Sequence, residues 1–525
     1  MTAIVLTTLN ARYTHCSLGL RYLLANMGKL QSHTTIREFM VGSQTRDIVE
    51  KLLEDHPQII GFGVYIWNVE EITRIIALLK RIAPQIKIVV GGPEVSFEIQ
   101  EQRICKLADY IITGWGDVSF GKLCNQILNG PPPLMKVHVG EQAALDTIVK
   151  PYSHYTDEDL AHRTIYVEAS RGCPFKCEFC LSALDKTSWP FELDSFLAEM
   201  KTLYERGARQ FKFVDRTFNL KTTHSLAILQ FFLERISLKD ACFVHFELIP
   251  DHLPDALKES ILQFPRGTLQ FEIGIQSLNP EVQTRISRRQ NNEKALANID
   301  WLVKHTHAHL HVDLIAGLPG EDLRSFAAGF DALWAVRPHE IQLGILKRLR
   351  GAPIDRHSQD FEMRYSPDPP YEILTTKAID FPTMQRLQRF ARYWDLVANS
   401  GRFAQTLDLL LSVKPHEKNL QQPSAFASFM AFSDWLYACT GKTHQIALER
   451  LFDLTHQWLL EQKLAPETID FAIKTDYLAS GAKGRLTIMS RGISVTGKTP
   501  KTKNSEMPLY PEPSPTPLRQ ARHKT

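Results

Sequence analysis

Three cysteines crowd into eight positions of the segment Arg171-Gly-Cys173-Pro-Phe-Lys-Cys177-Glu-Phe-Cys180. Thiolates at such short spacings favour zinc or an iron–sulfur cluster. A structural zinc ion takes four protein ligands, and no further cysteine or Cys/His pair lies nearby in the sequence. A cubane held by only three cysteines keeps one iron open to a substrate or cofactor. The spacing therefore predicts a catalytic [4Fe–4S] cluster rather than a zinc site or a chance grouping.

The cysteine loop comes directly after a predicted strand and opens a series in which strands alternate with helical patterns. Six βα-type units are typical of an incomplete, open (β/α)6 barrel, since a closed eight-fold barrel needs about 250 residues. Barrel enzymes keep their chemistry at the carboxyl ends of the strands, where this loop would lie. The predicted strands are 165–169, 210–214, 243–248, 269–276, 310–316 and 341–346.

A similar alternation precedes the cysteines, with predicted strands 3–6, 34–39, 59–66, 86–90 and 110–113. It predicts a Rossmann-like, doubly wound parallel sheet, which binds ligands at the carboxyl ends of its strands. Those ends are rich in glycine, which permits close approach of a ligand to the backbone. No Gly-x-Gly-x-x-Gly fingerprint follows the first strand, which argues against NAD. The glycine-rich ends read Gly61-Phe-Gly63-Val-Tyr65, Gly91-Gly92-Pro93-Glu94 and Gly114-Trp115-Gly116-Asp117.

The whole chain is thus predicted as an α/β protein with a C-terminal α-helical domain. We expect a Rossmann-like domain at 1–135, a linker at 136–155, the partial barrel at 156–370, the helical domain at 371–494 and a disordered tail at 495–525. The tail is rich in Pro, Lys, Ser and Thr and has almost nothing to bury. Aromatic residues recur at helical spacing in the helical domain, which we expect to cover the barrel mouth.

Composition sets limits on partners and location. The chain has 525 residues, a hydrophobic fraction of 44%, a charged fraction of 23% and a formal net charge of +3, so composition implies no nucleic-acid or membrane partner. No apolar run approaches the roughly 18 residues of a membrane span. The first residues predict a strand rather than a signal peptide. Five further cysteines are scattered, which favours a reducing, cytoplasmic location over a disulfide framework.

The CxxxCxxC loop, with Phe179 before its last cysteine, resembles the signature of the radical S-adenosylmethionine (SAM) superfamily. The resemblance implies that the open iron chelates the amino and carboxylate groups of SAM. One electron, from a donor such as flavodoxin or ferredoxin, then cleaves the sulfonium and yields a 5′-deoxyadenosyl radical. Cys173, Cys177 and Cys180 would be both metal ligands and catalytic residues.

Downstream segments resemble those of radical SAM enzymes related to the coproporphyrinogen dehydrogenases. The matching segments are Glu272-Ile-Gly-Ile-Gln276 with Arg288, and Asp313-Leu-Ile-Ala-Gly317-Leu318-Pro-Gly320. Each carboxylate can equally be a charge satisfied inside the barrel, and the common Gly-Gly-Glu motif at the second strand is absent. The predicted SAM-binding residues are Phe179, Asp215, Glu247, Glu272, Gln276, Arg288 and Leu318.

The N-terminal segment looks like the cobalamin-binding domain that accompanies some radical SAM domains. Free-standing cobalamin domains offer a histidine from an Asp-x-His-x-x-Gly motif, but here Tyr13 stands at the aspartate position and Gly19 comes one residue late. We therefore interpret His15 as a loop residue rather than a cobalt ligand. The candidate cobalamin contacts are Tyr13, His15, Gly63, Tyr65, Gly91, Gly92, Pro93, Glu94, Gly114, Gly116 and Asp117.

Together these features resemble an uncharacterised subgroup of cobalamin-binding radical SAM proteins with a C-terminal helical domain of unknown function. The resemblance implies an enzyme that transfers a methyl group to an unactivated carbon of a small molecule or lipid. No RNA-binding module accompanies these domains, which argues against a nucleic-acid substrate. Two alternatives stay open. One is a cobalamin-dependent rearrangement or redox enzyme without methyl transfer, and the other is a non-catalytic cobalamin- or cluster-binding regulator.

Overall fold

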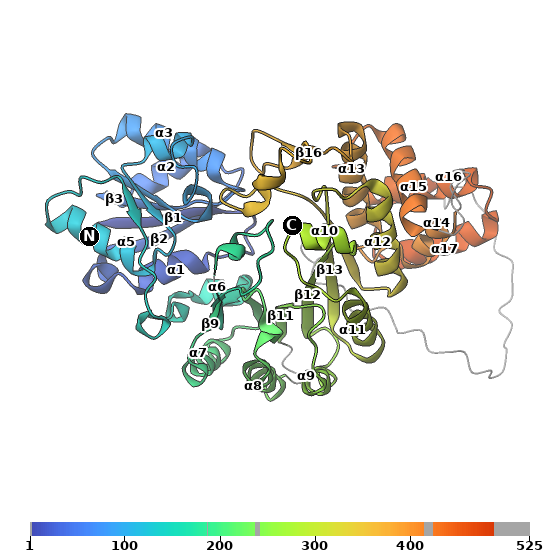
Figure 1. The fold of residues 1–525 in the computed structure, drawn as a ribbon, viewed down its shortest axis with the longest axis horizontal. Coiled ribbons are helices and arrows are strands. Elements are labelled where there is room, and N and C mark those ends of the chain that lie inside the picture. Colours follow the sequence, from blue (N-terminus) through green and yellow to red (C-terminus); the bar gives the residue numbers. More distant parts are fainter. Residues whose placement is uncertain (1–2, 186, 237–241, 414–423, 488–525) are drawn as a thin grey trace.

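A computed structural model describes residues 3–185, 187–236, 242–413 and 424–487. The chain folds into three parts, with the N-terminal α/β domain and the C-terminal helices on either side of a barrel-like sheet (Figure 1). The predicted disordered tail at 495–525 lies outside the described residues.

The N-terminal part is a six-stranded, all-parallel sheet with the order β2-β1-β3-β4-β5-β6. The chain order reverses between β1 and β3, and at such a switch point an open α/β sheet binds its ligand. The strands are β1 (Ile4–Asn10), β2 (Thr34–Met40), β3 (Ile59–Gly63), β4 (Lys87–Gly91), β5 (Tyr110–Thr113) and β6 (Val137–Val139). The short strand β6 lies within the predicted linker. Its backbone pairs with β5, and its side chains are only partly buried.

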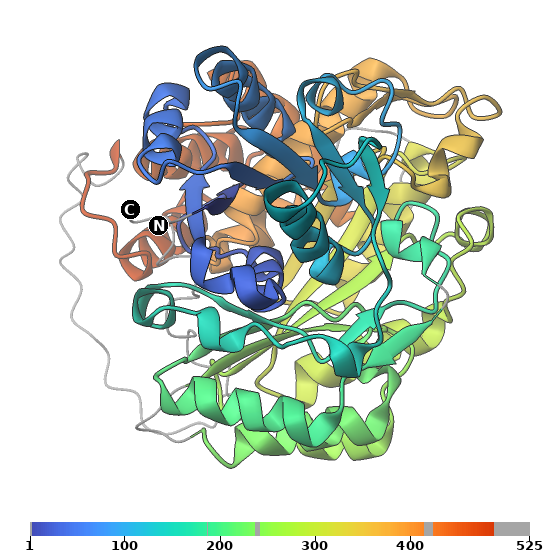
Figure 2. The same ribbon diagram turned by 90° about the vertical axis from the view of Figure 1, so that its left-hand side faces the viewer.

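Helices cover both faces of this sheet (Figure 2). Helices α2 (Thr45–Leu53), α3 (Val69–Ile82) and α4 (Arg103–Leu107) bury their apolar sides in one core, and α1 (Leu18–Ala25) and α5 (Asp117–Asn129) in another. Neighbouring residues of β1 alternate between the two cores, as a strand buried on both faces requires. The predicted doubly wound sheet is confirmed.

The central part is a second six-stranded parallel sheet with the order β7-β10-β11-β12-β13-β14. Its end strands, β7 and β14, do not pair with each other among the described residues, so the predicted partial barrel is open. The strands are β7 (Ile165–Val167), β10 (Gln210–Phe213), β11 (Phe243–Leu248), β12 (Leu269–Gln276), β13 (His309–Ala316) and β14 (Glu340–Ile345).

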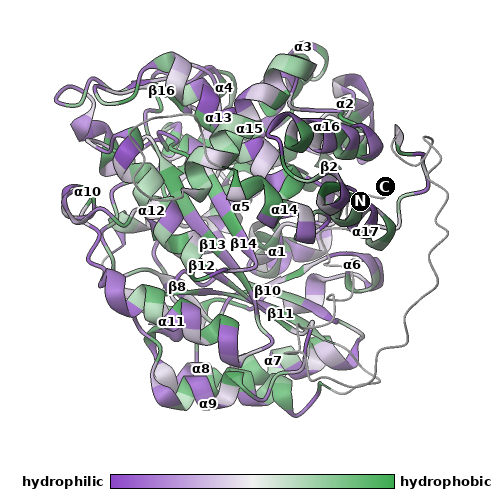
Figure 3. Cartoon of the chain, turned by 90° about the vertical axis from the view of Figure 1, so that its right-hand side faces the viewer, coloured by the Kyte–Doolittle hydropathy of each residue, from purple (hydrophilic) through white to green (hydrophobic). Residues whose placement is uncertain are grey.

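The outer layer of the barrel consists of amphipathic helices. These helices show hydrophilic and hydrophobic residues in alternation (Figure 3), as expected where one face of a helix packs on the core. They are α7 (Leu193–Glu205), α8 (Thr222–Leu233), α9 (Asp255–Ile261), α11 (Asn292–His305) and α12 (Leu323–Ala335). The short helix α10 (Pro280–Arg285) follows β12 and lies beside the cysteine loop, where Ile286 accepts a backbone hydrogen bond from Glu178.

The C-terminal helices pack on one flank of the barrel, which corrects the expectation that they cover its mouth. Phe330 of α12 contacts Phe390, Trp394 and Phe426, and Asn399 exchanges two hydrogen bonds of 3.1 and 3.0 Å with Ile341 on the free edge of β14. The aromatic stripe is therefore core. The helices are α13 (Phe381–Val397), α14 (Ala404–Ser412), α15 (Ala425–Thr440), α16 (Leu448–Glu461) and α17 (Pro466–Ala479).

The N-terminal domain packs against the start of the barrel. Arg21 forms a buried ion pair of 2.7 Å with Asp159 and another of 3.0 Å with Glu38, and the backbone of Thr14 accepts a hydrogen bond from Thr164. In the described part of the chain, none of the helices is long and apolar enough to cross a membrane.

Candidate functional site

The cysteine loop is closed by a short hairpin. Strand β8 (Ser170–Gly172) ends at the first cysteine, and β9 (Ser188–Pro190) returns antiparallel beside it. Gly172 has a φ of +83°, and a Cβ there would lie 2.4 Å from the carbonyl oxygen of Thr187. Only glycine lets the two strands approach this closely. The hairpin therefore fixes where the cysteines begin.

All three cysteines line one cavity of about 230 Å³ at the carboxyl ends of the barrel strands. Cys173 is buried, whereas Cys177 and Cys180 are partly exposed. Each thiolate of a cubane binds a different iron, so the three need not converge on a point. Consistently, no group of three His, Cys, Asp or Glu among the described residues could hold a single metal ion. The donor set fits a three-cysteine cluster.

Five of the predicted SAM-binding residues line the same cavity: Phe179, Glu247, Glu272, Gln276 and Arg288. They come from the cysteine loop, from β11 and β12 and from the turn after α10, so the structure brings together residues that lie far apart in the sequence. Arg216 and Asp313 also line it, although they were not predicted. Asp313 lay within a quoted motif, and the alternation of β13 was the signal that could have assigned it to the barrel interior.

Two carboxylates of this cavity, Glu247 and Glu272, face basic side chains. Glu247 lies 3.2 Å from Arg216, and Glu272 lies 3.5 Å from Lys212 and 3.2 Å from His245. Burial would raise the pKa of Glu272, but the hydrogen bond from His245 and the charge of Lys212 hold it below its ordinary value.

Asp313, in contrast, has a raised pKa. Burial raises it first, and the negative charges of Glu272 and Glu247 raise it further. The imidazole of His311 is 3.4 Å away. Neighbouring carboxylates of one cavity thus differ in their affinity for a proton, which is a common property of functional sites.

Arg288 places a positive charge beside the cluster ligands. Its Nη1 lies 3.5 Å from Sγ of Cys177, while its Nη2 donates hydrogen bonds to the carbonyl of Gly274 and, at 2.9 Å, to Gln290. Arg288 therefore lies between the cysteine loop and the end of β12, within the cavity that holds the three cysteines.

Glu178, between the second and third cysteines, anchors the loop and was missed in the sequence. Its buried carboxylate accepts hydrogen bonds from Ser287 at 2.5 Å and from Arg356, and lies 2.8 Å from Nε2 of His357. These partners lie more than 100 residues away in the chain, so local spacing gave no signal for them. The carboxylate ties the cysteine loop to the turn that carries Arg288.

Two predicted SAM contacts do not line the cavity. Leu318 is fully buried in the core. The Asp215 carboxylate accepts hydrogen bonds from the backbone of Ala169 at 3.0 Å and from the hydroxyl of Ser170 at 2.6 Å, so it holds the segment that leads into the cysteines. Burial raises the pKa of Asp215 to about 7.

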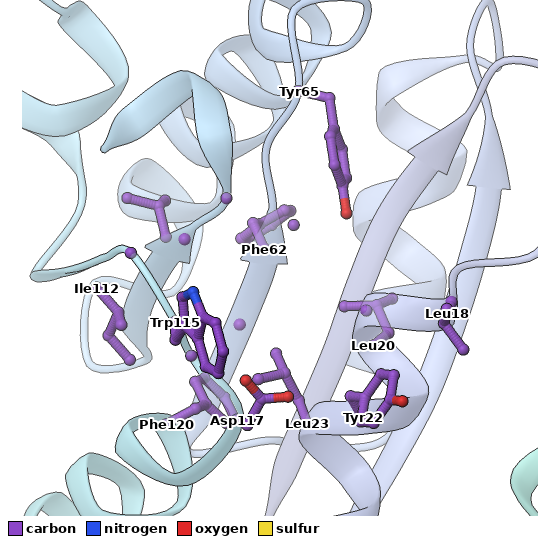
Figure 4. A pocket seen from close by; sticks show the side chains of 18 of the residues that line it. Leu18, Leu20, Tyr22, Leu23, Phe62, Tyr65, Ile112, Trp115, Asp117 and Phe120 are labelled. Carbon is purple, nitrogen blue, oxygen red and sulfur yellow. The ribbon is translucent and has the colours of Figure 1, made fainter. Parts of the chain in front are cut away.

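A second cavity of about 420 Å³ lies at the carboxyl ends of β3, β4 and β5 (Figure 4). Of the candidate cobalamin contacts, it is lined by Gly63, Tyr65, Gly91, Gly92, Gly114, Gly116 and Asp117. Gly92 has a φ of +114°, and a Cβ there would lie 2.5 Å from the carbonyl oxygen of Val64. Glycine and aromatic walls at a switch point suit the tail and ring of a large, flat cofactor such as cobalamin.

The remaining four candidates do not line this cavity. Tyr13 donates a hydrogen bond to Glu158 at 2.6 Å, and His15 pairs with Tyr166 at 2.6 Å, so the first loop contacts the barrel instead. His15 faces the barrel in this structure, and its interpretation as a loop residue stays a prediction.

Pro93 and Glu94 do not line the cavity either. Oε1 of Glu94 lies 3.0 Å from Arg350 and accepts a hydrogen bond of 2.8 Å from Tyr371. The Gly-Gly turn faces the cavity, whereas the next two residues connect it to the segment that leads to the helical domain.

Three family models match the three parts of the chain in succession. The model of the B12 binding domain matches residues 4–123, that of the Radical SAM superfamily residues 167–332, and that of a protein family of unknown function, DUF4080, residues 359–505. The chain is therefore a radical SAM enzyme with an N-terminal B12-binding domain. The DUF4080 match places it in the predicted subgroup with a C-terminal domain of unknown function.

Among curated proteins, the chain is similar to an uncharacterised methyltransferase, PH0819, of Pyrococcus horikoshii. The two are 23% identical over 330 residues, which cover 58% of this chain and 70% of that protein. It is 24% identical over 333 residues to the cobalamin-dependent radical SAM methyltransferase TokK of Streptomyces tokunonensis, covering 55% of this chain but only 47% of TokK.

Solved structures confirm the fold. The cobalamin-dependent SAM radical enzyme OxsB, with aqua-cobalamin and SAM bound, matches with a TM-score of 0.63 at 15% identity, over 92% of this chain and 82% of that one. The radical SAM methyltransferase TsrM of Kitasatospora setae, with tryptophan and a SAM analogue bound, matches with a TM-score of 0.52 at 16% identity, over 67% of this chain and 75% of that one.

Replacing Gly92 by alanine should weaken cobalamin binding about tenfold or more. The added Cβ meets the carbonyl oxygen of Val64 and strains a left-handed backbone. Equilibrium binding of hydroxocobalamin, followed by visible absorbance, measures the effect. Gly42→Ala is the matched control, because Gly42 also has a positive φ but no atom within 4 Å of the new Cβ. Equal binding by wild type and Gly92→Ala would show that this cavity is not the cobalamin-binding site.

Replacing Asp215 by asparagine should remove a pH dependence of stability. Because the native pKa of about 7 exceeds the ordinary 3.8, the folded protein holds a proton that the unfolded chain releases, and stability falls as pH rises between these values. Relative to wild type, Asp215→Asn should gain about 2 kcal/mol in free energy of unfolding between pH 5 and pH 7. Denaturant unfolding of the apoprotein at both values measures the difference, and parallel pH profiles would contradict this assignment.

Proposed function

We propose that this chain is a cobalamin-dependent radical SAM methyltransferase that acts on an unactivated carbon of a small molecule or lipid. One observation carries the proposal: a single segment, 168–185, lines both the glycine-walled cavity and the cysteine-lined cavity. A methyl donor and a radical source must reach the same carbon, so their sites have to adjoin. The printed names of PH0819 and TokK support methyl transfer as the reaction class.

When bound, the cluster and SAM supply a 5′-deoxyadenosyl radical, and cobalamin supplies a methyl group. The part of the protein is to bind, orient and exclude water. Glu247 and Glu272 present carboxylates to the cavity, where they can accept hydrogen bonds from ribose hydroxyls or from an ammonium group. Phe179 supplies an apolar surface beside them, and Arg288 holds the Cys177 side of the cluster.

Protein loaded anaerobically with iron and sulfide should release 5′-deoxyadenosine from SAM when dithionite is added. Cys177→Ala should abolish this release and lower the iron content, because one ligand of the cluster is lost. The control is Cys439→Ala, which removes an exposed thiol outside the cavity.

The products discriminate between the alternatives. Methyl transfer yields S-adenosylhomocysteine in addition to 5′-deoxyadenosine, whereas a rearrangement or redox reaction yields only the latter. A regulator yields neither despite an intact cluster, and that outcome would overturn the proposal.

The surface beside the cysteine loop is positively charged, which suits an acidic electron donor such as flavodoxin or ferredoxin. Lys176 and Arg289 are exposed, and the side chain of Arg356 is 62% exposed. Lys176 precedes Cys177 in the chain, Arg289 follows Arg288, which contacts Cys177, and Arg356 binds Glu178. A positive surface next to the cluster attracts an acidic partner and speeds encounter.

The eight cysteines are all free thiols, which supports a reducing, cytoplasmic location.

Reversing one of these charges should slow reduction by the protein donor more than reduction by dithionite. For Arg289→Glu we expect the ratio of the two rates to fall several-fold at low salt, and the deficit to shrink as added salt screens the surface. Stopped-flow reduction of the cluster measures both rates. Lys201→Glu, on the exposed side of α7, is the control. An unchanged ratio would place the donor elsewhere.

A further inference from the structure

Arg171, two residues before the first cysteine, bridges the two cofactor domains. Its Nη1 and Nη2 donate to the two carboxylate oxygens of Asp117 at 2.9 and 3.0 Å, and its Nε donates to Glu168 at 2.9 Å. A planar guanidinium that binds a carboxylate through two parallel hydrogen bonds holds a fixed orientation. The bridge therefore sets both the distance and the angle between helix α5 and the start of the cysteine loop.

Aromatic rings pack against the guanidinium of Arg171. The guanidinium carbon lies 4.5 Å from the ring centre of Tyr22 and 4.9 Å from that of Trp115, both in the N-terminal domain. Trp115 in turn meets Trp189 of β9 edge to face at 6.0 Å. The Arg171 side chain is only 12% exposed. Breaking one partner of such a pair leaves a buried charge uncompensated, which is strongly unfavourable.

The same atoms form walls of the cobalamin cavity. Tyr22, Trp115, Asp117, Glu168 and Arg171 all line it. A ligand that fills the cavity packs against the rings and the carboxylate that hold the guanidinium, and so restricts their motion.

The other end of the bridge belongs to the cysteine loop. Asp215 fixes Ala169 and Ser170 from the barrel side, and Cys173 follows Arg171 after a single glycine. Residues 169–172 are thus held between two carboxylates, one from each domain. Any shift of Asp117 relative to Asp215 moves the first cluster ligand.

We propose that Arg171 is a positioning residue that couples the two cavities, so that a corrinoid in the N-terminal cavity tightens the binding of SAM at the cysteine loop. The inference rests on the proposed function and adds an order of assembly to it. Because coupling between two sites is reciprocal, SAM tightens corrinoid binding by the same factor. Loading of either cofactor then favours the complete site.

The test compares the dissociation constant of SAM with and without hydroxocobalamin, on full-length protein that carries its cluster. In wild type we expect hydroxocobalamin to tighten SAM binding about tenfold, within the usual range of coupling between sites. In Arg171→Lys, which keeps the charge but loses the two-pronged contact with Asp117, we expect less than about twofold. The change that SAM causes in the electron paramagnetic resonance spectrum of the reduced cluster reports binding without turnover.

Two further variants isolate the bridge. Asp117→Asn removes the carboxylate while leaving Arg171 paired with Glu168, and should lose the coupling even if Arg171→Lys fails to fold. Arg348→Lys alters another inter-domain ion pair, with Glu98 at 2.8 Å, whose members line neither cavity, and should keep the coupling. Coupling that survives in both bridge variants, or wild type that binds both ligands independently, would overturn the inference. Wild type that binds neither ligand would instead overturn the proposed function.

Discussion

The structure depends on one constraint: a short segment before the first cysteine has to be fixed by two domains at once. Residues 168–172 are anchored to the barrel through Asp215 and to the B12-binding domain through Asp117. A cluster loop held from one side only could move relative to the other cavity. Two buried carboxylates remove that freedom, so the two cavities keep a common wall.

The segment that leads to the C-terminal helices also contacts both cofactor domains. Those helices bury an aromatic core against α12. Arg350 binds Glu94 beside the Gly-Gly turn, and His357 lies against Glu178 in the cysteine loop. The segment just before the match to the family of unknown function thus contacts both cofactor domains, although the C-terminal helices do not cover the barrel mouth.

The two sheets and the cysteine loop could be predicted because their signals lie in short stretches of sequence. Parallel strands buried on both faces are continuous apolar runs, and the cysteine spacing lies within eight residues. The direction in which a side chain points could not be predicted in this way, because it depends on partners far along the chain. Glu94 follows the motif but turns to Arg350, 256 residues away, and Tyr13 and His15 turn to the barrel. The Asp215 carboxylate accepts a hydrogen bond from Ser170 and does not line the cysteine-lined cavity.

The central claim is that three thiolates leave one iron of the cluster open to SAM. Mössbauer spectroscopy of protein reconstituted with iron-57 tests this most directly, because it distinguishes iron sites by their ligands. We expect added SAM to change the signal of one iron in four and to leave the other three unaltered. Four irons that stay equivalent and unchanged with SAM bound would contradict it.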